Sequence, residues 1–345
     1  MTTYYALIAV IGLVRLLTTK IFINKDKGNR LFVLLSFLLT VLLQGLRSPT
    51  VGTDIQGYLV GYKLCGVSSW GTPVLNYEIG YRTFCKLLYS MGVPEQTFLF
   101  IVALICQGAV FLFILRHSKF PACSIVMYLT FGLFTFSFSG LRQMLSIAIA
   151  LFGFDNIKNR NFVGFLVFVL IASTFHTSAI LLLLAYPLYF IKPAGNVLYL
   201  MLGALIVELL FGKRLVVLAG YLYGRTIETA NTGAYAAFLM YLLVWVASNL
   251  LIKARGDTAA FINYCYIAAL VQGLGRYHGS VARAGYWFAF FVCLLVPQVI
   301  ASVTSRNWKM RFAMTTVLIG CCLVYFNINT GDGYLNVSPY VPYWE

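Results

Sequence analysis

The sequence predicts an all-α polytopic membrane protein with about twelve transmembrane helices, and two observations lead to this prediction. Of its 345 residues, 61% are hydrophobic and only 10% are charged, whereas a soluble domain carries about a quarter charged residues. Apolar stretches separated by short polar connectors also recur from one end of the chain to the other. So few charges could not cover a water-soluble fold, and soluble classes are therefore excluded.

The apolar stretches predict the helices in chain order. They lie at residues 4–17, 31–46, 98–115, 121–138, 141–154, 162–175, 178–191, 197–211, 234–251, 261–275, 284–303 and 312–326. Several are shorter than the ~20 residues that a helix needs to cross about 30 Å of hydrocarbon. These must extend into their polar flanks or be re-entrant, so about ten to fourteen spans are expected. We expect residues 1–345 to form one integral membrane domain.

Lysine and arginine predict the orientation, because they are enriched in cytoplasmic connectors. The connectors that we assign to the cytoplasm hold Lys20, Lys25, Lys27, Arg30, Arg116, Lys119, Lys158, Arg160, Lys192, Lys253, Arg255, Arg306, Lys309 and Arg311. The opposite, outer face carries Arg47, Lys63, Arg82, Lys86, Arg142, Lys213, Arg214, Arg225, Arg276 and Arg283. Topology does not require these outer cations, so with the net charge of +15 they indicate an anionic ligand on the outer side. Nucleic acid is excluded by this location.

The long outer connector, residues 47–92, contains a Gly-Thr-Asp turn and then a predicted amphipathic interfacial helix at residues 76–91. Glu78, Arg82 and Lys86 recur on one face of this helix, and aromatic and aliphatic residues lie on another. The charged face is either an ordinary surface with a Glu78–Arg82 pair or part of a site. An outer tail at residues 327–345, which includes Asp332, Tyr334 and Tyr340, is either a lid or a frayed end.

An arginine opens the fifth predicted span in the sequence Ser-Gly-Leu-Arg-Gln, residues 139–143. Ionisable side chains within spans usually face a bundle interior or a wet cavity, although an arginine near a helix end can also snorkel. The sixth span ends on the same side at His176. Packed helices lie roughly 8 to 10 Å apart, so we expect Arg142 and His176 to contact a shared ligand.

Two more cations flank the predicted hairpin between the tenth and eleventh spans. Arg276 and His278 follow the tenth span, and Arg283 precedes the eleventh. They are either snorkelling cations in an aromatic belt or a second clamp on a phosphate group, for which the planar donor fork of arginine is suited.

Cysteine and acidic residues give no signal for a metal or another cofactor. The eight cysteines lie mostly in apolar stretches without CxxC spacing, so no metal or redox role is predicted. Cys65 and Cys85 lie outside these stretches, as free thiols or as a pair. No cluster of Asp, Glu and His has ligand spacing, and we therefore expect no metal and no cofactor.

The order of these motifs resembles that of a known family. Arg47, residues 51–54 with Tyr58, residues 77–81, residues 140–143, residues 175–179 and Arg283 are similar to the EpsG branch of the Wzy-type polysaccharide polymerases. The resemblance covers most of the chain. It implies a multi-pass protein of the bacterial inner (cytoplasmic) membrane with a GT-C-like helical bundle and an active site that faces the periplasm or the outside.

The resemblance also implies a reaction. A growing glycan is transferred from undecaprenyl pyrophosphate to a hydroxyl of the next lipid-linked repeat unit, so undecaprenyl-pyrophosphate-linked oligosaccharides are both donor and acceptor. Membrane lipid surrounds the protein, and a chain-length regulator and a flippase of the same pathway are candidate partners. The product class, whether O-antigen, capsule or exopolysaccharide, stays open.

The residues fit this chemistry independently of the resemblance. A departing pyrophosphate gathers negative charge, which fixed arginines offset without a metal; we assign Arg142 and Arg283 to this role, with Arg276 and Arg47 in support. The acceptor hydroxyl needs a proton acceptor within hydrogen-bond reach. His176 is the first candidate, and Asp54 and Glu78 either replace it or orient sugars and arginines. Further candidates for substrate contact are Arg82, Gln143, His278 and Tyr340.

Two other functions are alternatives to a polymerase. A flippase of the same lipid-linked glycans needs ionisable residues through the depth of the bundle, because its substrate crosses the bilayer. Here these residues crowd at one face, with Arg15 as an exception, which favours an enzyme. A membrane acyltransferase needs a histidine near the cytoplasm, where His117 is the one histidine predicted.

The charge pattern predicts that Arg142, His176, Arg283 and Asp54 all face the external side. Single cysteines placed beside them in a cysteine-free background should therefore react with a membrane-impermeant thiol reagent in intact spheroplasts. Labelling that appears only after lysis would contradict this topology.

Overall fold

The computed structural model describes the 345-residue chain except residues 223–225, 227, 230–234, 304–307, 332 and 334. Arg225, Arg306, Asp332 and Tyr334, which entered the sequence analysis, lie outside the described residues. The part of the chain that is described is helical and contains no β-strand, as predicted.

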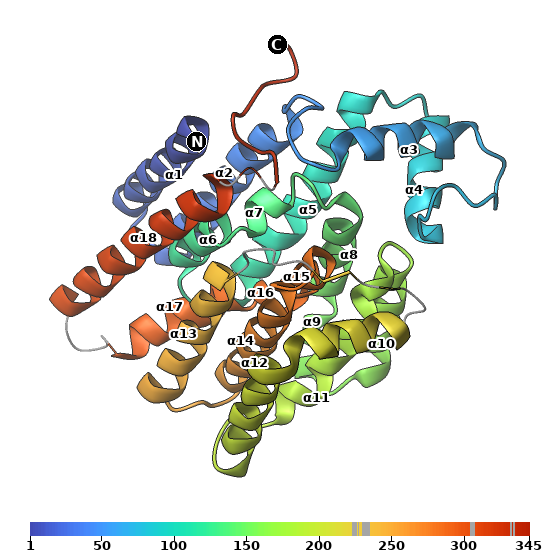
Figure 1. Ribbon diagram of the computed structural model, residues 1–345. Helices are drawn as coiled ribbons and strands as arrows, with labels where there is room; N and C mark the ends of the chain where they lie inside the picture. Colours follow the sequence, from blue (N-terminus) through green and yellow to red (C-terminus); the bar gives the residue numbers. More distant parts are fainter. Residues whose placement is uncertain (223–225, 227, 230–234, 304–307, 332, 334) are drawn as a thin grey trace. The chain divides into compact units, whose positions relative to one another are not determined.

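The elements follow one another along the chain as shown in Figure 1. They are α1 (Thr2–Ile21), α2 (Lys25–Gly45), α3 (Ile55–Val67), α4 (Ile79–Ser90), α5 (Glu95–His117), α6 (Pro121–Thr130), α7 (Leu133–Phe136), α8 (Leu141–Phe152), α9 (Phe154–Lys158), α10 (Phe162–Ser173), the 3₁₀ helix η1 (Thr177–Leu184), α11 (Ala185–Phe190), α12 (Asn196–Leu222), α13 (Tyr235–Leu251), α14 (Asp257–Gly275), α15 (Gly279–Ala284), α16 (Tyr286–Ala289), α17 (Val292–Val303) and α18 (Trp308–Gly331).

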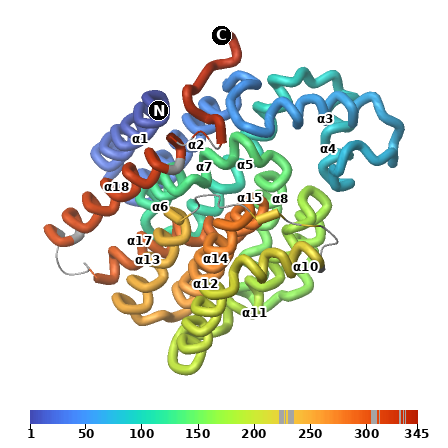
Figure 2. The backbone as a smooth tube through the Cα atoms, in the orientation of Figure 1, coloured from blue at the N-terminus to red at the C-terminus, as the bar shows by residue number. Residues whose placement is uncertain are grey.

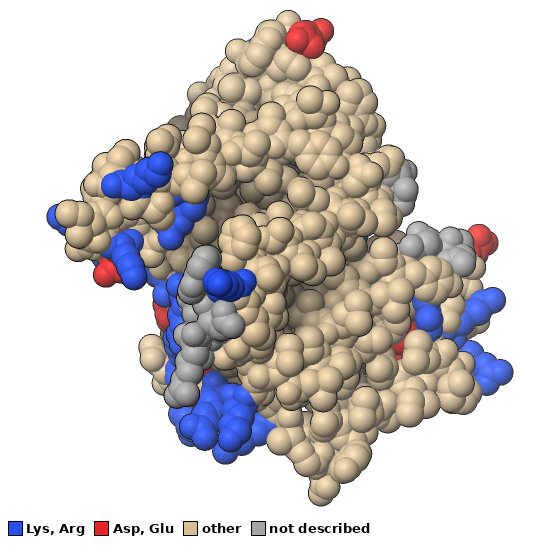
Figure 3. All heavy atoms as spheres, turned by 90° about the vertical axis from the view of Figure 1, so that its left-hand side faces the viewer, with Lys and Arg blue, Asp and Glu red and all other residues tan. Residues whose placement is uncertain are grey.

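Apolar helices indicate a membrane protein. Among the described residues, four helices are long and apolar enough to cross a bilayer, namely α1, α2, α5 and α14. A fifth span results if Gly279–Ala289 and Val292–Val303, which are bent by 52°, count as one. Figure 3 shows one face with wide areas that carry no charged side chains. Twelve spans and a GT-C-like arrangement remain predictions, because further apolar helices, such as Pro121–Thr130 and Phe162–Ser173, are only 10–17 residues long.

Several predicted spans are interrupted by local backbone geometry. The stretch at 121–138 breaks between α6 and α7, where Gly132 has a φ of 79° in the left-handed region that commonly ends a helix. The stretch at 178–191 begins as the 3₁₀ helix η1. The predicted helix at 76–91 begins at Ile79, because Glu78 is extended at the N-cap. A hydrophobic pattern does not report these breaks, since glycine and extended residues interrupt it too briefly.

The described residues form two compact units, each described by itself. Unit 1 comprises Met1–Ile180 and Ile319–Glu345, and unit 2 comprises Leu181–Leu318. In unit 1 the largely buried helix α5 packs against α2 and α8, and α3 packs against α4. In unit 2 the buried helix α14 packs against α11, α12, α13 and α17.

The C-terminal tail returns to the beginning of the chain (Figure 2). The backbone N–H of Ser48 donates to the carbonyl of Val341 at 2.8 Å, and that of Tyr343 donates to Leu46 at 2.9 Å. The Tyr4 hydroxyl donates to the carbonyl of Val337 at 2.8 Å. These bonds attach the tail to unit 1, in which Leu335 and Val337 are buried.

The turn at residues 52–54 is held between this tail and the segment before α8. Gly52 has a φ of 110°, and a Cβ added there would lie 2.4 Å from the carbonyl oxygen of Phe138. The Thr53 N–H lies within hydrogen-bond distance of both the Leu335 carbonyl (3.0 Å) and the Ser139 hydroxyl (3.1 Å). The close approach requires glycine, and it fixes where α3 begins relative to α8.

We expect Gly52→Ala to destabilise the protein more than Gly71→Ala, although both glycines have positive φ. Gly71 has a φ of 82° and open space around its Cβ position, so alanine there costs about 1 kcal/mol through its backbone alone. At Gly52 the collision with Phe138 adds to that cost. Thermal unfolding of the purified variants in detergent measures the difference, and equal melting temperatures would contradict the packing described here.

Candidate functional site

The Glu78 carboxylate connects three segments that are distant in the sequence. Nη1 of Arg142 donates to its Oε2 at 2.6 Å. The backbone N–H and the hydroxyl of Thr177 donate to its Oε1 at 3.0 and 3.2 Å. Nδ1 of His176 lies 3.4 Å from the same oxygen. We call Glu78, Arg142, His176 and Thr177 the Glu78 cluster.

A glycine lets α4 approach the end of α10 closely enough to form this cluster. The Gly80 N–H donates to the carbonyl of Thr174 at 2.8 Å. A Cβ at Gly80 would lie 2.2 Å from the Thr174 hydroxyl, so any other residue would push the two segments apart. The close contact between Gly80 and Thr174 explains why a glycine lies two residues after Glu78.

Helix α8 brings Arg142 to the cluster from the other side. Arg142 lies in the first turn of α8, and the Ser146 hydroxyl one turn later donates to the carbonyl of Ala172 in α10. The two helices pack against each other. The helical hairpin expected from the sequence thus places Arg142 and His176 on one shared carboxylate.

Aromatic rings and a carbonyl fix the guanidinium further. Arg142 lies 4.7 Å from the ring centroid of Tyr77 and 6.0 Å from that of Tyr58, and its Nη1 also donates to the Asn76 carbonyl at 3.1 Å. Its Nε has no hydrogen-bond partner among the residues that the structure describes. Tyr58, Tyr77 and Thr177 were not predicted as site residues, because residues so far apart in sequence leave no spacing signal.

The cluster is accessible and charged. The side chains of Glu78, Arg142 and His176 are 15%, 21% and 27% exposed, so a ligand can reach them. Partial burial by itself raises the pKa of Glu78, but hydrogen bonds from His176 and the Thr177 N–H, together with the Arg142 charge, lower it to about 2. A carboxylate with so low a pKa is a weak base at neutral pH. Glu78 is therefore suited to hold Arg142 and His176 in place.

Arg47 and Tyr340, two predicted substrate contacts, bind the backbone of their own unit. The Arg47 side chain donates to the carbonyls of Gln44 at 3.0 Å and Phe138 at 3.1 Å, and the residue is 0% exposed. The Tyr340 hydroxyl donates to the Leu43 carbonyl at 2.9 Å. A ligand cannot reach Arg47 in this arrangement, which makes it a support for the segment before α8.

The remaining predicted residues of unit 1 occupy different positions. Asp54 is the N-cap residue of α3 and is partly exposed. Gln143 is 4% exposed. Nη1 of Arg82 donates to the carbonyl of Thr72 at 2.6 Å, so the alternative of an ordinary Glu78–Arg82 pair is wrong: Glu78 is bound to Arg142 instead.

In unit 2 a buried ion pair involves Arg276. Its Nη2 lies 3.1 Å from Oε1 of Glu208, whose side chain is 1% exposed. A Cβ at Gly273 would lie 2.8 Å from that carboxylate, so glycine makes room for the pair. Glu208 was not among the predicted site residues, although an acidic residue within an apolar stretch was a signal for it.

The other two predicted residues of unit 2 lie on the short helix α15. Nδ1 of His278 accepts a hydrogen bond from the Ser280 N–H at 3.3 Å and so caps the helix N-terminus. Arg283 lies in its last turn and is partly exposed.

Comparison with known proteins gives a family match. The model of the EpsG family matches residues 30–343, nearly the whole chain, and confirms the resemblance drawn from the order of the motifs. No curated protein and no solved structure matches. In the part of the chain that the structure describes, no three His, Cys, Asp or Glu side chains are grouped to hold a metal ion.

We expect Glu78→Gln to lower the melting temperature in a pH-dependent way. Because the pKa of Glu78 is about 2 in the folded protein and about 4.3 in an unfolded chain, its charge stabilises the fold above pH ~4.3. That contribution disappears as the pH falls towards 2. The difference in melting temperature between Glu78→Gln and the wild type should therefore be largest at pH 7 and should shrink below pH ~4.3.

The matched control is Glu95→Gln. Glu95 pairs with Lys63 at 2.9 Å, but both side chains are exposed, by 38% and 60%, and such pairs stabilise a protein little. A pH-independent loss in Glu78→Gln, or an equal loss in both variants, would contradict the assignment.

Proposed function

The chain belongs to the EpsG family, and on this premise we propose that it is a membrane polysaccharide polymerase with its reacting groups in the Glu78 cluster. The reaction transfers a growing glycan from undecaprenyl pyrophosphate to a hydroxyl of the next lipid-linked repeat unit, on the outer side of the bacterial inner membrane. The observation that carries the proposal is the cluster itself, where an arginine and a histidine from neighbouring helix ends share one carboxylate.

Arg142 is the group that binds the pyrophosphate. Glu78 and the Asn76 carbonyl hold one end of its guanidinium, and within the described part of the chain its Nε has no hydrogen-bond partner. A guanidinium fixed in this way needs no rearrangement when negative charge develops on the leaving group, and a fixed donor of this kind stabilises a transition state most. The same role, which the sequence suggests for Arg283, stays a prediction. The proposal requires no metal or cofactor.

His176 is the group that accepts the proton. Its Nδ1 lies 3.4 Å from Oε1 of Glu78, and a carboxylate at this position orients the imidazole that takes the proton of the acceptor hydroxyl. The hydroxyl oxygen bonds to the anomeric carbon, the bond from that carbon to the phosphate oxygen breaks, and undecaprenyl pyrophosphate leaves with the electron pair. Asp54 remains a second candidate for the base.

We expect Arg142→Ala to abolish polymer formation. Removing one fixed donor aimed at developing charge typically costs on the order of a hundredfold to a thousandfold in rate. Arg142→Lys should restore little, because an ammonium keeps the charge but loses the two-pronged geometry. The measurement is a gel of extracted glycan, in which single repeat units should replace the ladder of lengths, together with turnover of a lipid-linked repeat unit by the purified protein.

The control for Arg142→Ala is Lys63→Ala, which removes an exposed cation of α3 and should leave the ladder intact. Both purified variants are also checked for thermal stability. A full ladder from well-expressed Arg142→Ala would remove this arginine from the reaction, and a lost ladder with collapsed stability would show that the residue is structural.

A further inference from the structure

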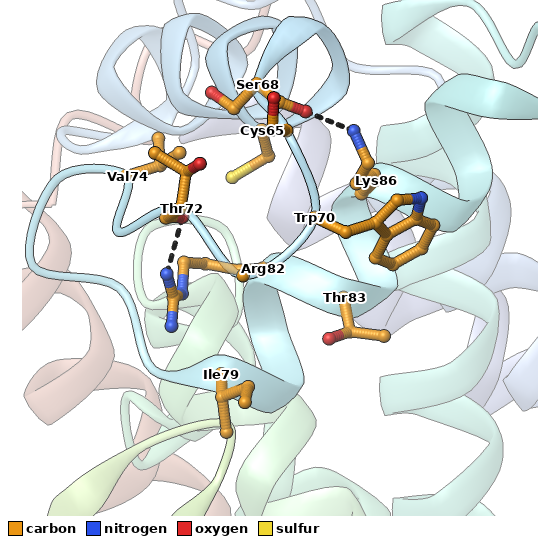
Figure 4. A pocket seen from close by; sticks show the side chains of 11 residues that line it. Cys65, Ser68, Trp70, Thr72, Val74, Ile79, Arg82, Thr83 and Lys86 are labelled. Carbon is orange, nitrogen blue, oxygen red and sulfur yellow. Dashed lines mark hydrogen bonds between the residues drawn. The ribbon is translucent and has the colours of Figure 1, made fainter.

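A cavity of about 190 Å³ lies beside the Glu78 cluster, between α3, α4 and the loop that joins them. Its lining includes Cys65, Ser68, Trp70, Thr72, Arg82 and Lys86 (Figure 4), and we call it the α3–α4 pocket. Ile79, which also lines it, directly follows Glu78. Helix α4 therefore contributes to both sites, with its N-cap residue in the cluster and its next two turns in the pocket.

Two cations of this pocket have no carboxylate partner among the described residues. Nη1 of Arg82 donates to the Thr72 carbonyl at 2.6 Å, and Nζ of Lys86 donates to the carbonyls of Gly66, at 3.2 Å, and Ser68. Figure 4 shows Arg82 with Thr72 on one side of the cavity and Lys86 with Trp70 on another. Nε of Arg82 is buried, and no described residue forms a hydrogen bond with it. Neutral carbonyls do not compensate two positive charges, so the pocket favours an anion.

A thiol in the same lining reports this positive potential. The pKa of Cys65 lies below its ordinary value, chiefly because Cys85 donates a hydrogen bond to it and further because of the Arg82 and Lys86 charges. Both cysteines are free and buried, so the pair left open by the sequence is a thiol pair here.

The other lining groups fit a sugar ring. The Trp70 indole has Lys86 Nζ 5.1 Å from its ring centroid, yet it remains 63% exposed. An exposed aromatic face accepts the apolar C–H face of a pyranose, and the hydroxyls of Ser68 and Thr83 accept or donate hydrogen bonds. The cavity holds about six waters at ~30 Å³ each, which is the space of one sugar residue and too little for a whole repeat unit.

We propose that the α3–α4 pocket binds one acidic sugar of the repeat unit, a hexuronic acid whose carboxylate lies between Arg82 and Lys86 and whose ring contacts Trp70. This deepens the proposed function and rests on it. Because α4 joins the two sites, an acidic residue held in the pocket would bring a nearby hydroxyl of the acceptor glycan to His176. The pocket would then select which repeat unit is polymerised.

The test measures binding of methyl glucuronide and methyl glucoside to the purified full-length protein by saturation-transfer NMR and titration. We expect the glucuronide to bind and the neutral glucoside to bind at least tenfold more weakly. Arg82→Gln and Lys86→Gln should each weaken glucuronide binding by roughly tenfold to a hundredfold, since each removes a charged donor. Lys63→Gln, which removes a cation of α3 that is paired with Glu95, should leave it unchanged.

Several results would overturn the proposal. Equal binding of both glycosides, or glucuronide binding that survives Arg82→Gln together with Lys86→Gln, would show that the cations do not recognise a carboxylate. Displacement of glucuronide by inorganic phosphate or by phosphatidylglycerol vesicles at matched concentration would assign the pocket to a phosphate or a lipid headgroup. Variants are compared only where they elute as the wild type does. If Arg82→Gln fails this check, Arg82→Lys takes its place; it keeps the charge but loses the two-pronged geometry, so it should still weaken glucuronide binding, and unchanged binding would count against the proposal.

The same measurements separate this proposal from the proposed function. Arg142→Ala should lose polymer and keep glucuronide binding. If the purified wild type forms no polymer yet binds glucuronide through Arg82 and Lys86, the proposed function fails and the pocket stands. If it forms polymer and does not prefer glucuronide, the pocket assignment fails and the proposed function stands.

Discussion

The arrangement of unit 1 around its site depends on one ionised carboxylate, that of Glu78. It accepts hydrogen bonds from Arg142 in α8 and from Thr177 at the start of η1, and it lies beside His176. A charge at the N-cap of α4 thereby joins two helix ends that would otherwise hold unpaired donors. Without it Arg142 would lose its counter-ion and the imidazole its orienting partner. Gly80 makes this possible by letting α4 touch α10.

A second constraint comes from buried polar side chains, which need hydrogen-bond partners in an apolar interior. The Gln44 amide donates to the carbonyl of Ser137 at 2.7 Å, and that of Gln107 donates to the Gln44 side-chain carbonyl at 2.6 Å. Arg47 adds its bond to Phe138. Together these hydrogen bonds hold the segment that precedes α8. The position of Arg142 therefore depends on buried residues. Arg47 thus acts on the site indirectly.

Helix α4 gives the two proposed sites a common support. Its N-cap residue Glu78 binds Arg142. In its later turns, Arg82 and Lys86 donate hydrogen bonds to carbonyls of the α3–α4 loop and the end of α3. Helical spacing places Glu78, Arg82 and Lys86 on one face of α4, yet each of them binds a different segment. A helix that supports both proposed sites fixes the distance between them, which favours the positioning of one acceptor hydroxyl.

The sequence by itself determined the membrane class, the helical content, the order of the motifs and the expectation that Arg142 and His176 lie at neighbouring helix ends. These follow from composition and from patterns within a few turns of one helix. Only the tertiary structure decided that Glu78 binds Arg142, 64 residues away, that Arg82 turns to Thr72 and that Arg47 is buried. It also revealed the helix break at Gly132 and the α3–α4 pocket. Contacts between distant segments leave no periodic trace, because they depend on how close a glycine such as Gly80 lets two backbones come.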